Sequence, residues 1–148
     1  MGRVGFVTHP LFEAHEMGPG HPESPERLRA IHARLESTGT LARLVSITPK
    51  AAPREWVETV HESTYVEKLE RRSPSSGYAS LDADTTLCSS SLSAAYLGAG
   101  GAMAAADAVM AKQIDQAFCA VRPPGHHAEA DQAMGFCLLN NVAIVAKY

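Results

Sequence analysis

Residues 121–130 read V-R-P-P-G-H-H-A-E-A and continue an uninterrupted apolar run, A-F-C-A-V, at residues 117–121. A short run of this kind is typical of a strand that is covered on both faces, as in a parallel sheet. Pro123 and Pro124 end the strand, because proline has no N–H to donate and fixes φ. The sequence therefore predicts a buried parallel strand that stops abruptly before a polar segment.

Two adjacent histidines, His126 and His127, follow this stop. Gly125 allows the chain to turn where a side chain would obstruct it, which places both imidazoles just past the carboxyl end of the strand. Open α/β sheets bind ligands at this end. Histidine titrates near neutral pH, so it can accept a proton and return it, and the titrations of two neighbouring imidazoles are coupled. The alternative to a catalytic role is a structural one, in which two loop histidines only make hydrogen bonds with the backbone.

The remaining segments alternate between strand and helix patterns. A helix is expected to begin at Ser24, which can act as its N-cap, and another is expected to be capped by Asn140 or Asn141. The alternation predicts a three-layer α/β fold with a mainly parallel sheet and no second domain. The expected strands are residues 3–8, 44–47 and 117–121, and the expected helices lie near residues 24–38, 56–61, 65–72, 92–112 and 141–148.

Composition narrows the class of protein. The 148 residues are 45% hydrophobic with a formal net charge of −3, which suits one domain with a real core. No basic stripe suggests nucleic-acid binding, and no stretch approaches transmembrane length. The three cysteines are odd in number and widely separated, which favours free thiols and a reducing compartment. The start of the chain lacks a signal-peptide pattern, so we expect a cytoplasmic protein.

Several segments together resemble the histone deacetylase family, which includes the acetylpolyamine amidohydrolases and bacterial deacetylase-like amidohydrolases. The segments occur in the family's order, and their wording is closer to the class II-like bacterial members. The pairing of R-P-P-G-H-H-A with G-F-C-L-L-N-N is especially specific. The matching segments are residues 21–28 (H-P-E-S-P-E-R-L), 60–65 (V-H-E-S-T-Y), 82–85 (D-A-D-T), 122–128 (R-P-P-G-H-H-A) and 134–141 (M-G-F-C-L-L-N-N).

The resemblance implies an arginase-like fold and zinc-dependent hydrolysis of an N-acetyl amide, on an acetylated lysine side chain or an acetylpolyamine. It implies that His127 is the general base and acid, and that His126 gives electrostatic support and helps to manage protons. Phe136 would line the channel for the acetylated side chain, and the Gly135 backbone would contact the substrate. Asp84 is assigned to substrate binding at the channel rim, with simple solvation of its loop as the alternative.

The resemblance also implies that the zinc ligands, an Asp-x-His pair and a later Asp, lie downstream of Tyr148. No residue of this chain is assigned to the metal. We therefore expect residues 1–148 to be the N-terminal part of a single catalytic domain, incomplete at the C-terminus, with a last helix that stops in mid-pattern. The chain alone is expected to be inactive, and an oligomer is compatible with the sequence.

Other polar residues receive structural interpretations. His9, His15 and His21 are expected in loop and surface roles, because their spacing fits no known ligand pattern. His61 is expected to stabilise its local helix. Arg122 is expected to anchor the loop through carboxylate or carbonyl contacts rather than to meet substrate.

Two rival functions stay open. One is a truncated or degenerate product without a metal site, which acts, if at all, by binding a partner. The other is a different metallohydrolase on the related arginase-like scaffold, which the G-H-H-A context disfavours.

Overall fold

A three-stranded parallel sheet lies at the centre of the computed structural model, which describes residues 2–148. The central strand β1 (Val4–Val7) pairs with β2 (Val45–Ile47) on one side and with β5 (Gln116–Cys119) on the other. Parallel neighbours need crossover connections, and helices supply them here. Each strand therefore delivers its carboxyl end to the same edge of the sheet.

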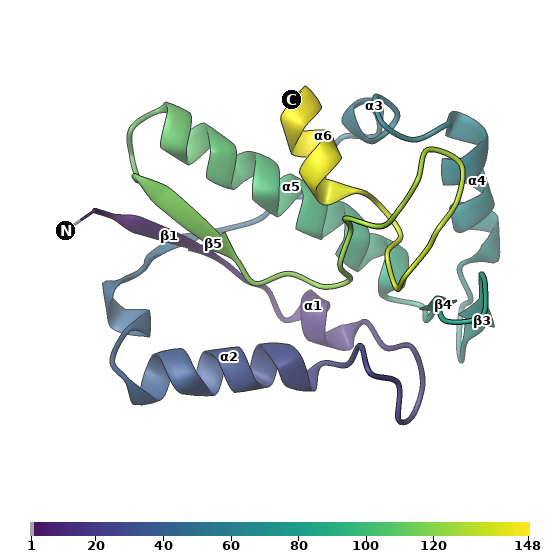
Figure 1. The fold of residues 1–148 in the computed structure, drawn as a ribbon, viewed down its shortest axis with the longest axis horizontal. Coiled ribbons are helices and arrows are strands. Elements are labelled where there is room, and N and C mark those ends of the chain that lie inside the picture. Colours follow the sequence, from purple (N-terminus) through teal and green to yellow (C-terminus); the bar gives the residue numbers. More distant parts are fainter. Residues whose placement is uncertain (1) are drawn as a thin grey trace.

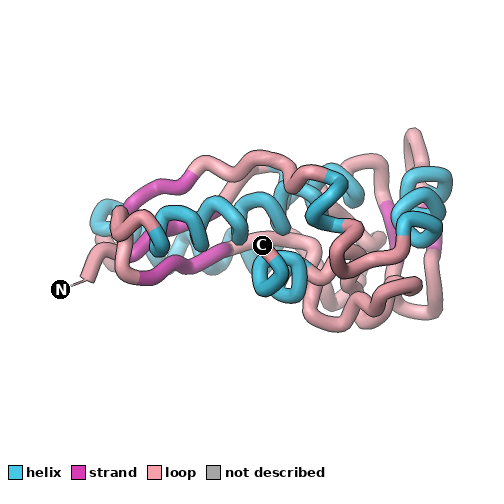
Figure 2. Tube along the Cα trace, turned by 90° about the horizontal axis from the view of Figure 1, so that it is seen from above, coloured by secondary structure: helices cyan, strands magenta, loops and turns pink. Residues whose placement is uncertain are grey.

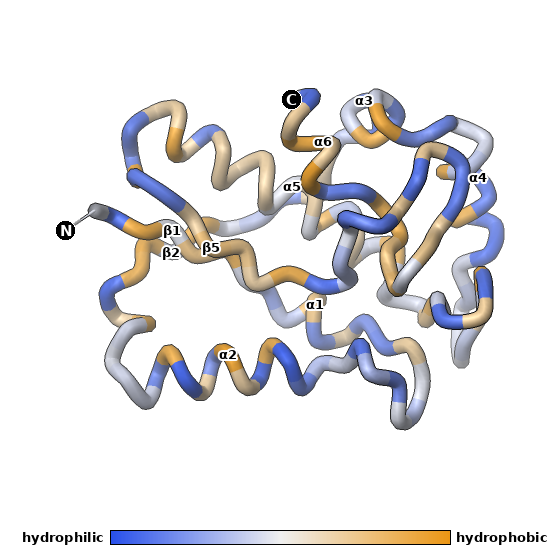
Figure 3. The backbone as a smooth tube through the Cα atoms, in the orientation of Figure 1, coloured by the Kyte–Doolittle hydropathy of each residue, from blue (hydrophilic) through white to orange (hydrophobic). Residues whose placement is uncertain are grey.

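Helices cover the two faces of this sheet. The long helix α5 (Ser91–Met110) lies on one face and α2 (Glu26–Ser37) lies on the other (Figure 1). The apolar residues of α2 are turned toward the sheet and its polar residues away from it (Figure 3). Leu28 of α2 is fully buried in a cluster with Phe6 of β1. The expected three-layer α/β arrangement is confirmed.

The alanine- and glycine-rich sequence of α5 allows the backbone of another segment to approach it closely. A Cβ atom at Gly100 would lie 1.8 Å from the carbonyl oxygen of Lys50. Only glycine fits at this crossing, so dense packing offsets the low helix propensity of the residue.

A second apolar cluster supports the loops beyond the sheet. It joins α5 to α3 (Arg54–Val57), α4 (Ser63–Arg72) and α6 (Asn141–Lys147). The small elements are α1 (Leu11–Ala14), the 3₁₀ turn η1 (Leu41–Arg43), and the antiparallel pair β3 (Ala79–Ser80) and β4 (Thr86–Leu87). Viewed from above, the loops gather at the end of the molecule toward which the strands run (Figure 2).

Two local expectations are wrong. Ser24 does not cap α2: the N-cap residue is Pro25, and no side chain makes a capping hydrogen bond. The strand before the histidines is not covered on both faces, since most of β5 is exposed and Phe118 keeps 42% of its accessible surface. Within residues 2–148, β5 pairs only with β1 and forms an edge of the sheet. An apolar run does not reveal whether a strand has one neighbour or two.

Within residues 2–148, none of the helices combines the length and the apolar character that a bilayer crossing requires.

Candidate active site

The loop of residues 120–140 carries the histidine pair from the end of β5 to the start of α6 (Figure 1). Its two ends approach each other closely at Gly125, where a Cβ atom would lie 2.4 Å from the carbonyl oxygen of Leu139. The predicted need for glycine at this turn is confirmed. The loop therefore leaves the carboxyl edge of the sheet, folds back on itself and presents its middle to solvent.

His126 and His127 lie side by side and are both exposed. Their ring centroids are 4.2 Å apart and the ring planes are inclined by 47°. The backbone N–H of His127 donates to Sγ of Cys137, at 3.4 Å. Burial raises the pKa of the Cys137 thiol, so this neighbour is neutral. Two imidazoles at this separation can exchange protons with a shared substrate or water.

Gly135 and Phe136 pack beside the pair in an uncommon backbone conformation. Both have positive φ, 55° at Gly135 and 70° at Phe136. A Cβ atom at Gly135 would lie 3.0 Å from Cδ2 of His127, so the imidazole lies directly against the glycine backbone. A bulky residue with positive φ is unusual and needs support from its surroundings.

Thr85 supplies part of this support. Its buried hydroxyl oxygen accepts the N–H of Phe136, at 3.1 Å, and donates to a carboxylate oxygen of Asp84 at the same distance. The exposed Asp84 is thereby linked to Phe136 through one side chain. The structure thus brings together all five predicted site residues, His126, His127, Gly135, Phe136 and Asp84.

His21 packs beside Phe136 and Asp84, although the sequence predicted only a loop or surface role for it. Its ring meets the Phe136 ring edge-on, with centroids 4.8 Å apart and planes inclined by 82°. Its Nε2 lies 3.0 Å from the carbonyl oxygen of Asp84, and its Nδ1 accepts the N–H of Glu23 at 3.1 Å. A tautomer with hydrogen on Nε2 satisfies both contacts. His21 therefore fixes Asp84 and Phe136 relative to each other.

Asp82 shapes the turn that holds Asp84. One carboxylate oxygen accepts the N–H of Asp84 at 2.9 Å and that of Thr85 at 2.6 Å. Burial raises the pKa of the Asp82 carboxyl, but these hydrogen bonds outweigh it and lower the pKa below its usual value. Asp82 is therefore occupied by its own loop.

Arg122 anchors the start of the histidine loop, as predicted. It is fully buried, and Nε and Nη2 donate to the two carboxylate oxygens of Glu23 at 2.8 and 2.6 Å. Nη1 donates to the carbonyl oxygen of Phe12 at 2.8 Å. Each of the three guanidinium nitrogens therefore donates to a protein group, which fits the predicted anchoring role.

The surface role expected for His15 is wrong. His15 is fully buried, with Nδ1 2.8 Å from Oγ of Ser91 and Nε2 3.7 Å from a Glu23 oxygen. Burial lowers its pKa to about 4, because the charged form loses its hydration, and Glu23 compensates only in part. His15 is therefore neutral at pH 7 and its contact with Glu23 is not an ion pair.

His61 lies between α3 and α4, within neither helix, and it has a wider role than the local helix stabilisation that the sequence predicted. Its buried imidazole contacts Glu129 and Asn140, both in the histidine loop. Sequence patterns did not indicate this contact or that of Thr85, because each joins residues more than 50 positions apart. The only available signal was that both residues lie within the segments 60–65 and 82–85, which recur in the related family.

The donor atoms of residues 2–148 do not make a metal site by themselves. No group of three or more histidine, cysteine, aspartate or glutamate side chains within this range could hold an ion. Structural and catalytic zinc sites take at least three protein ligands. The two histidines are therefore not a zinc site on their own.

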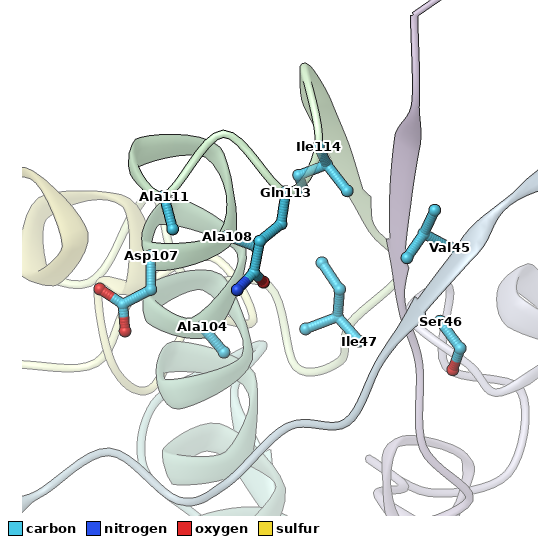
Figure 4. A pocket seen from close by; sticks show the side chains of 9 residues that line it. All are labelled: Val45, Ser46, Ile47, Ala104, Asp107, Ala108, Ala111, Gln113 and Ile114. Carbon is cyan, nitrogen blue, oxygen red and sulfur yellow. The ribbon is translucent and has the colours of Figure 1, made fainter.

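A pocket of about 410 Å³ lies apart from the histidine pair, near the amino end of β5 (Figure 4). Side chains of β2, of the last turns of α5 and of the segment before β5 line it, among them Ile47, Asp107 and Gln113. No residue that the sequence singled out for chemistry contributes to its wall. The candidate site therefore lies outside this pocket.

Comparison with known proteins identifies the same family that the sequence segments resemble. The profile of the histone deacetylase domain matches residues 21–148. A probable deacetylase from Archaeoglobus fulgidus is 41% identical over 147 residues, which are 98% of this chain and 40% of that protein. The histone deacetylase-like amidohydrolase of Pseudomonas aeruginosa is 42% identical over 125 residues, which are 84% of this chain and 33% of that protein. The chain thus spans well under half the length of these relatives.

Solved structures agree with the sequence comparison. The crystal structure of the HDA15 HD domain superposes with a TM-score of 0.92 at 33% identity, over 99% of this chain and 43% of that one. The predicted deacetylase-like fold is therefore confirmed. With a family profile that covers most of its residues, this chain belongs to the histone deacetylase family.

Proposed function

We propose that residues 1–148 are the N-terminal part of a zinc-dependent deacetylase domain that hydrolyses the N-acetyl amide of an acetylated lysine side chain or an acetylpolyamine. The observation that carries the proposal is the exposed pair His126 and His127, 4.2 Å apart, on a loop at the carboxyl edge of a parallel sheet. Family membership supports the reaction class.

The two histidines have distinct roles in this proposal. His127 accepts a proton from the attacking water and then donates one to the departing amine, which needs a single imidazole that works in both directions. His126 lies against it and stabilises the charge that passes through the pair.

The substrate is held by Gly135, Phe136 and Asp84, which lie beside the histidine pair. Phe136 offers an aromatic surface to the aliphatic part of the acetylated chain, and the backbone of Gly135 contacts the acetamide. Asp84, exposed at the rim, accepts a hydrogen bond from the substrate. The primary amine released on hydrolysis is common to lysine and polyamines, so the shared group is an acetylated primary alkylamine.

The zinc belongs to residues outside this chain. The histidines of residues 2–148 lack enough neighbouring donors to hold it, and a bound zinc would polarise the acetyl carbonyl. A coding sequence that continues past Tyr148 is expected to contain an Asp-x-His pair and a later Asp. We place the reaction in the cytoplasm, a location consistent with the three free thiols of Cys88, Cys119 and Cys137.

The test compares the complete gene product with its His127→Asn variant on an acetyl-lysine peptide and on N-acetylputrescine. Loss of a general base and acid should lower kcat by about 10²- to 10⁴-fold. His9→Asn, at an exposed position outside the loop, is the matched control and should keep full activity. Wild-type turnover that survives His127→Asn, or no turnover of either substrate by zinc-loaded protein, would contradict the proposal.

A further inference from the structure

His61 lies just before α4 and its imidazole is almost fully buried, with 2% of its surface exposed. Nδ1 lies 2.8 Å from the carbonyl oxygen of Glu129, and Nε2 accepts the backbone N–H of Asn140 at 2.8 Å. A carbonyl only accepts and an amide N–H only donates, so one tautomer, with hydrogen on Nδ1, satisfies both contacts. Burial lowers the pKa of His61, which keeps the ring neutral and both bonds intact at neutral pH.

The two partners of His61 stand at opposite ends of the segment 129–140. Two further hydrogen bonds join the ends of this segment to each other and to the chain beside His61. Nδ2 of Asn140 donates to the carbonyl of Ala128 at 3.1 Å, and the N–H of Glu62 donates to the carbonyl of Ala130 at 2.8 Å. The His61 imidazole contacts the backbone of both ends, and the Asn140 side chain joins the same two ends directly. His61 therefore helps to set the distance between the two ends of the segment.

The segment that His61 closes carries the groups that touch the histidine pair. Gly135 lies against the ring of His127, and Sγ of Cys137 accepts the N–H of His127. Movement of the two ends would shift Gly135 relative to His127 and release the ring. Misplacement of a catalytic group by about 1 Å can cost 100-fold in rate.

We infer that His61 is a positioning residue: by joining the Glu129 carbonyl to the Asn140 amide, its imidazole holds the loop that presents His127 and Phe136. The catalytic consequence rests on the proposed function, whereas the effect on loop geometry does not. A residue that only adds stability would leave the geometry of the folded molecule unchanged.

Three substitutions separate the two contacts. His61→Phe keeps an aromatic ring, although a larger one, and removes both hydrogen bonds. His61→Asn retains a donor near the position of Nδ1, and His61→Gln retains an acceptor near that of Nε2. The matched control is His32→Phe, because His32 is a half-buried histidine with one side-chain hydrogen bond, to Thr8 at 2.9 Å, outside the histidine loop.

The first measurement is kcat and KM of the complete gene product on an acetyl-lysine peptide. We expect kcat to fall roughly 10- to 100-fold in His61→Phe. At least one of the Asn and Gln variants should recover part of the loss, and His32→Phe should keep the wild-type kcat. The second measurement is the set of His126 and His127 ring signals in ¹H–¹³C NMR spectra, which should move in His61→Phe and stay in place in the control.

Each outcome decides the inference. Lower melting temperature with unchanged kcat and unmoved ring signals overturns it and leaves His61 a structural brace. If His61→Phe does not fold, the Asn and Gln variants decide by the same two measurements. If the wild-type protein hydrolyses no acetyl amide, the proposed function fails, and the NMR signals alone then test whether His61 positions the pair.

Discussion

Arg122 and Glu23, 99 positions apart in sequence, form a buried two-point ion pair. The pair connects the start of the histidine loop to the segment before α2, and that segment also carries His21. His21 packs against Phe136. The Arg122–Glu23 pair therefore links the start of the histidine loop to the segment that supports Phe136.

Breaking this pair should cost much more than breaking an exposed one. Arg122→Met removes the buried cation and leaves the Glu23 carboxylate with only the half-exposed Arg27 guanidinium, at 3.4 Å. We expect a loss of about 3–5 kcal/mol in the free energy of unfolding. Equilibrium urea unfolding measures the loss. The double variant Arg122→Met with Glu23→Leu should recover part of it, because no uncompensated charge then remains.

Arg29 provides the control for this prediction. It pairs with Glu13 and Glu26 at an exposed position, so Arg29→Met should lower the free energy of unfolding far less than Arg122→Met does. Equal losses for Arg122→Met and Arg29→Met would show that the buried pair contributes nothing special.

Gly135→Ala should disturb His127 as well as the backbone. A methyl group there meets a positive φ of 55° and lies 3.0 Å from the His127 ring. The backbone strain should cost about 1–2 kcal/mol, and the ring should shift to relieve the contact. The measurement combines urea unfolding with the NMR signals of the His127 ring.

Gly77→Ala separates the two effects. Gly77 has a φ of 69° but nothing within 4 Å of an added Cβ, so it should show the strain without the shift of His127. If both variants leave the His127 signals in place, Gly135 does not hold that ring.

Burial of His15 should make the fold less stable in mild acid. Its pKa is about 4 in the folded protein against 6.5 unfolded, so between these values the unfolded chain binds more protons. Stability should therefore fall as the pH drops from 6.5 toward 4, by on the order of 3 kcal/mol from this residue. His61, whose pKa is also lowered by burial, adds to the loss in the same direction.

Urea unfolding at pH 7 and at pH 4.5 tests this. His15→Asn should flatten the dependence and leave the part that belongs to His61. His9→Gln, at an exposed position, should keep the wild-type slope. A slope that is unchanged in His15→Asn would exclude His15 as its source.

Much of the fold could be predicted from the sequence because local signals and tertiary structure agree there. The apolar run before Pro123 predicted β5, and Asn140 caps α6 as expected, with its side-chain oxygen accepting the N–H of Ala143 at 3.0 Å. Both signals act over a few residues. Expectations for exposed or buried position were less secure, since a run such as 117–121 has the same letters in an edge strand and in a central one.

The sequence predicted the loop residues of the candidate site, but not the distant residues that hold those loops in place. His126, His127, Gly135 and Phe136 are close in sequence, so two neighbouring motifs, residues 122–128 and 134–141, identified them together. Their supports come from distant segments, and only the folded chain shows that His61 reaches Asn140 across 79 positions. Burial likewise decided the state of His15, which its spacing from other histidines did not indicate.

The exposed edge strand β5 should make the isolated 148-residue chain prone to associate. Phe118 keeps 42% of its surface exposed, and β5 pairs with β1 alone within residues 2–148. An apolar edge strand with unpaired backbone groups is a template for contact with another chain. Phe118→Lys should therefore lower the sedimentation-detected oligomer fraction and delay aggregation on heating. Met110→Lys removes an even more exposed apolar side chain, 82% accessible at the end of α5, but leaves the strand edge unchanged. Met110→Lys should therefore have little effect on association. A wild-type chain that stays monomeric and melts cooperatively at high temperature would show that the exposed β5 edge does not cause association.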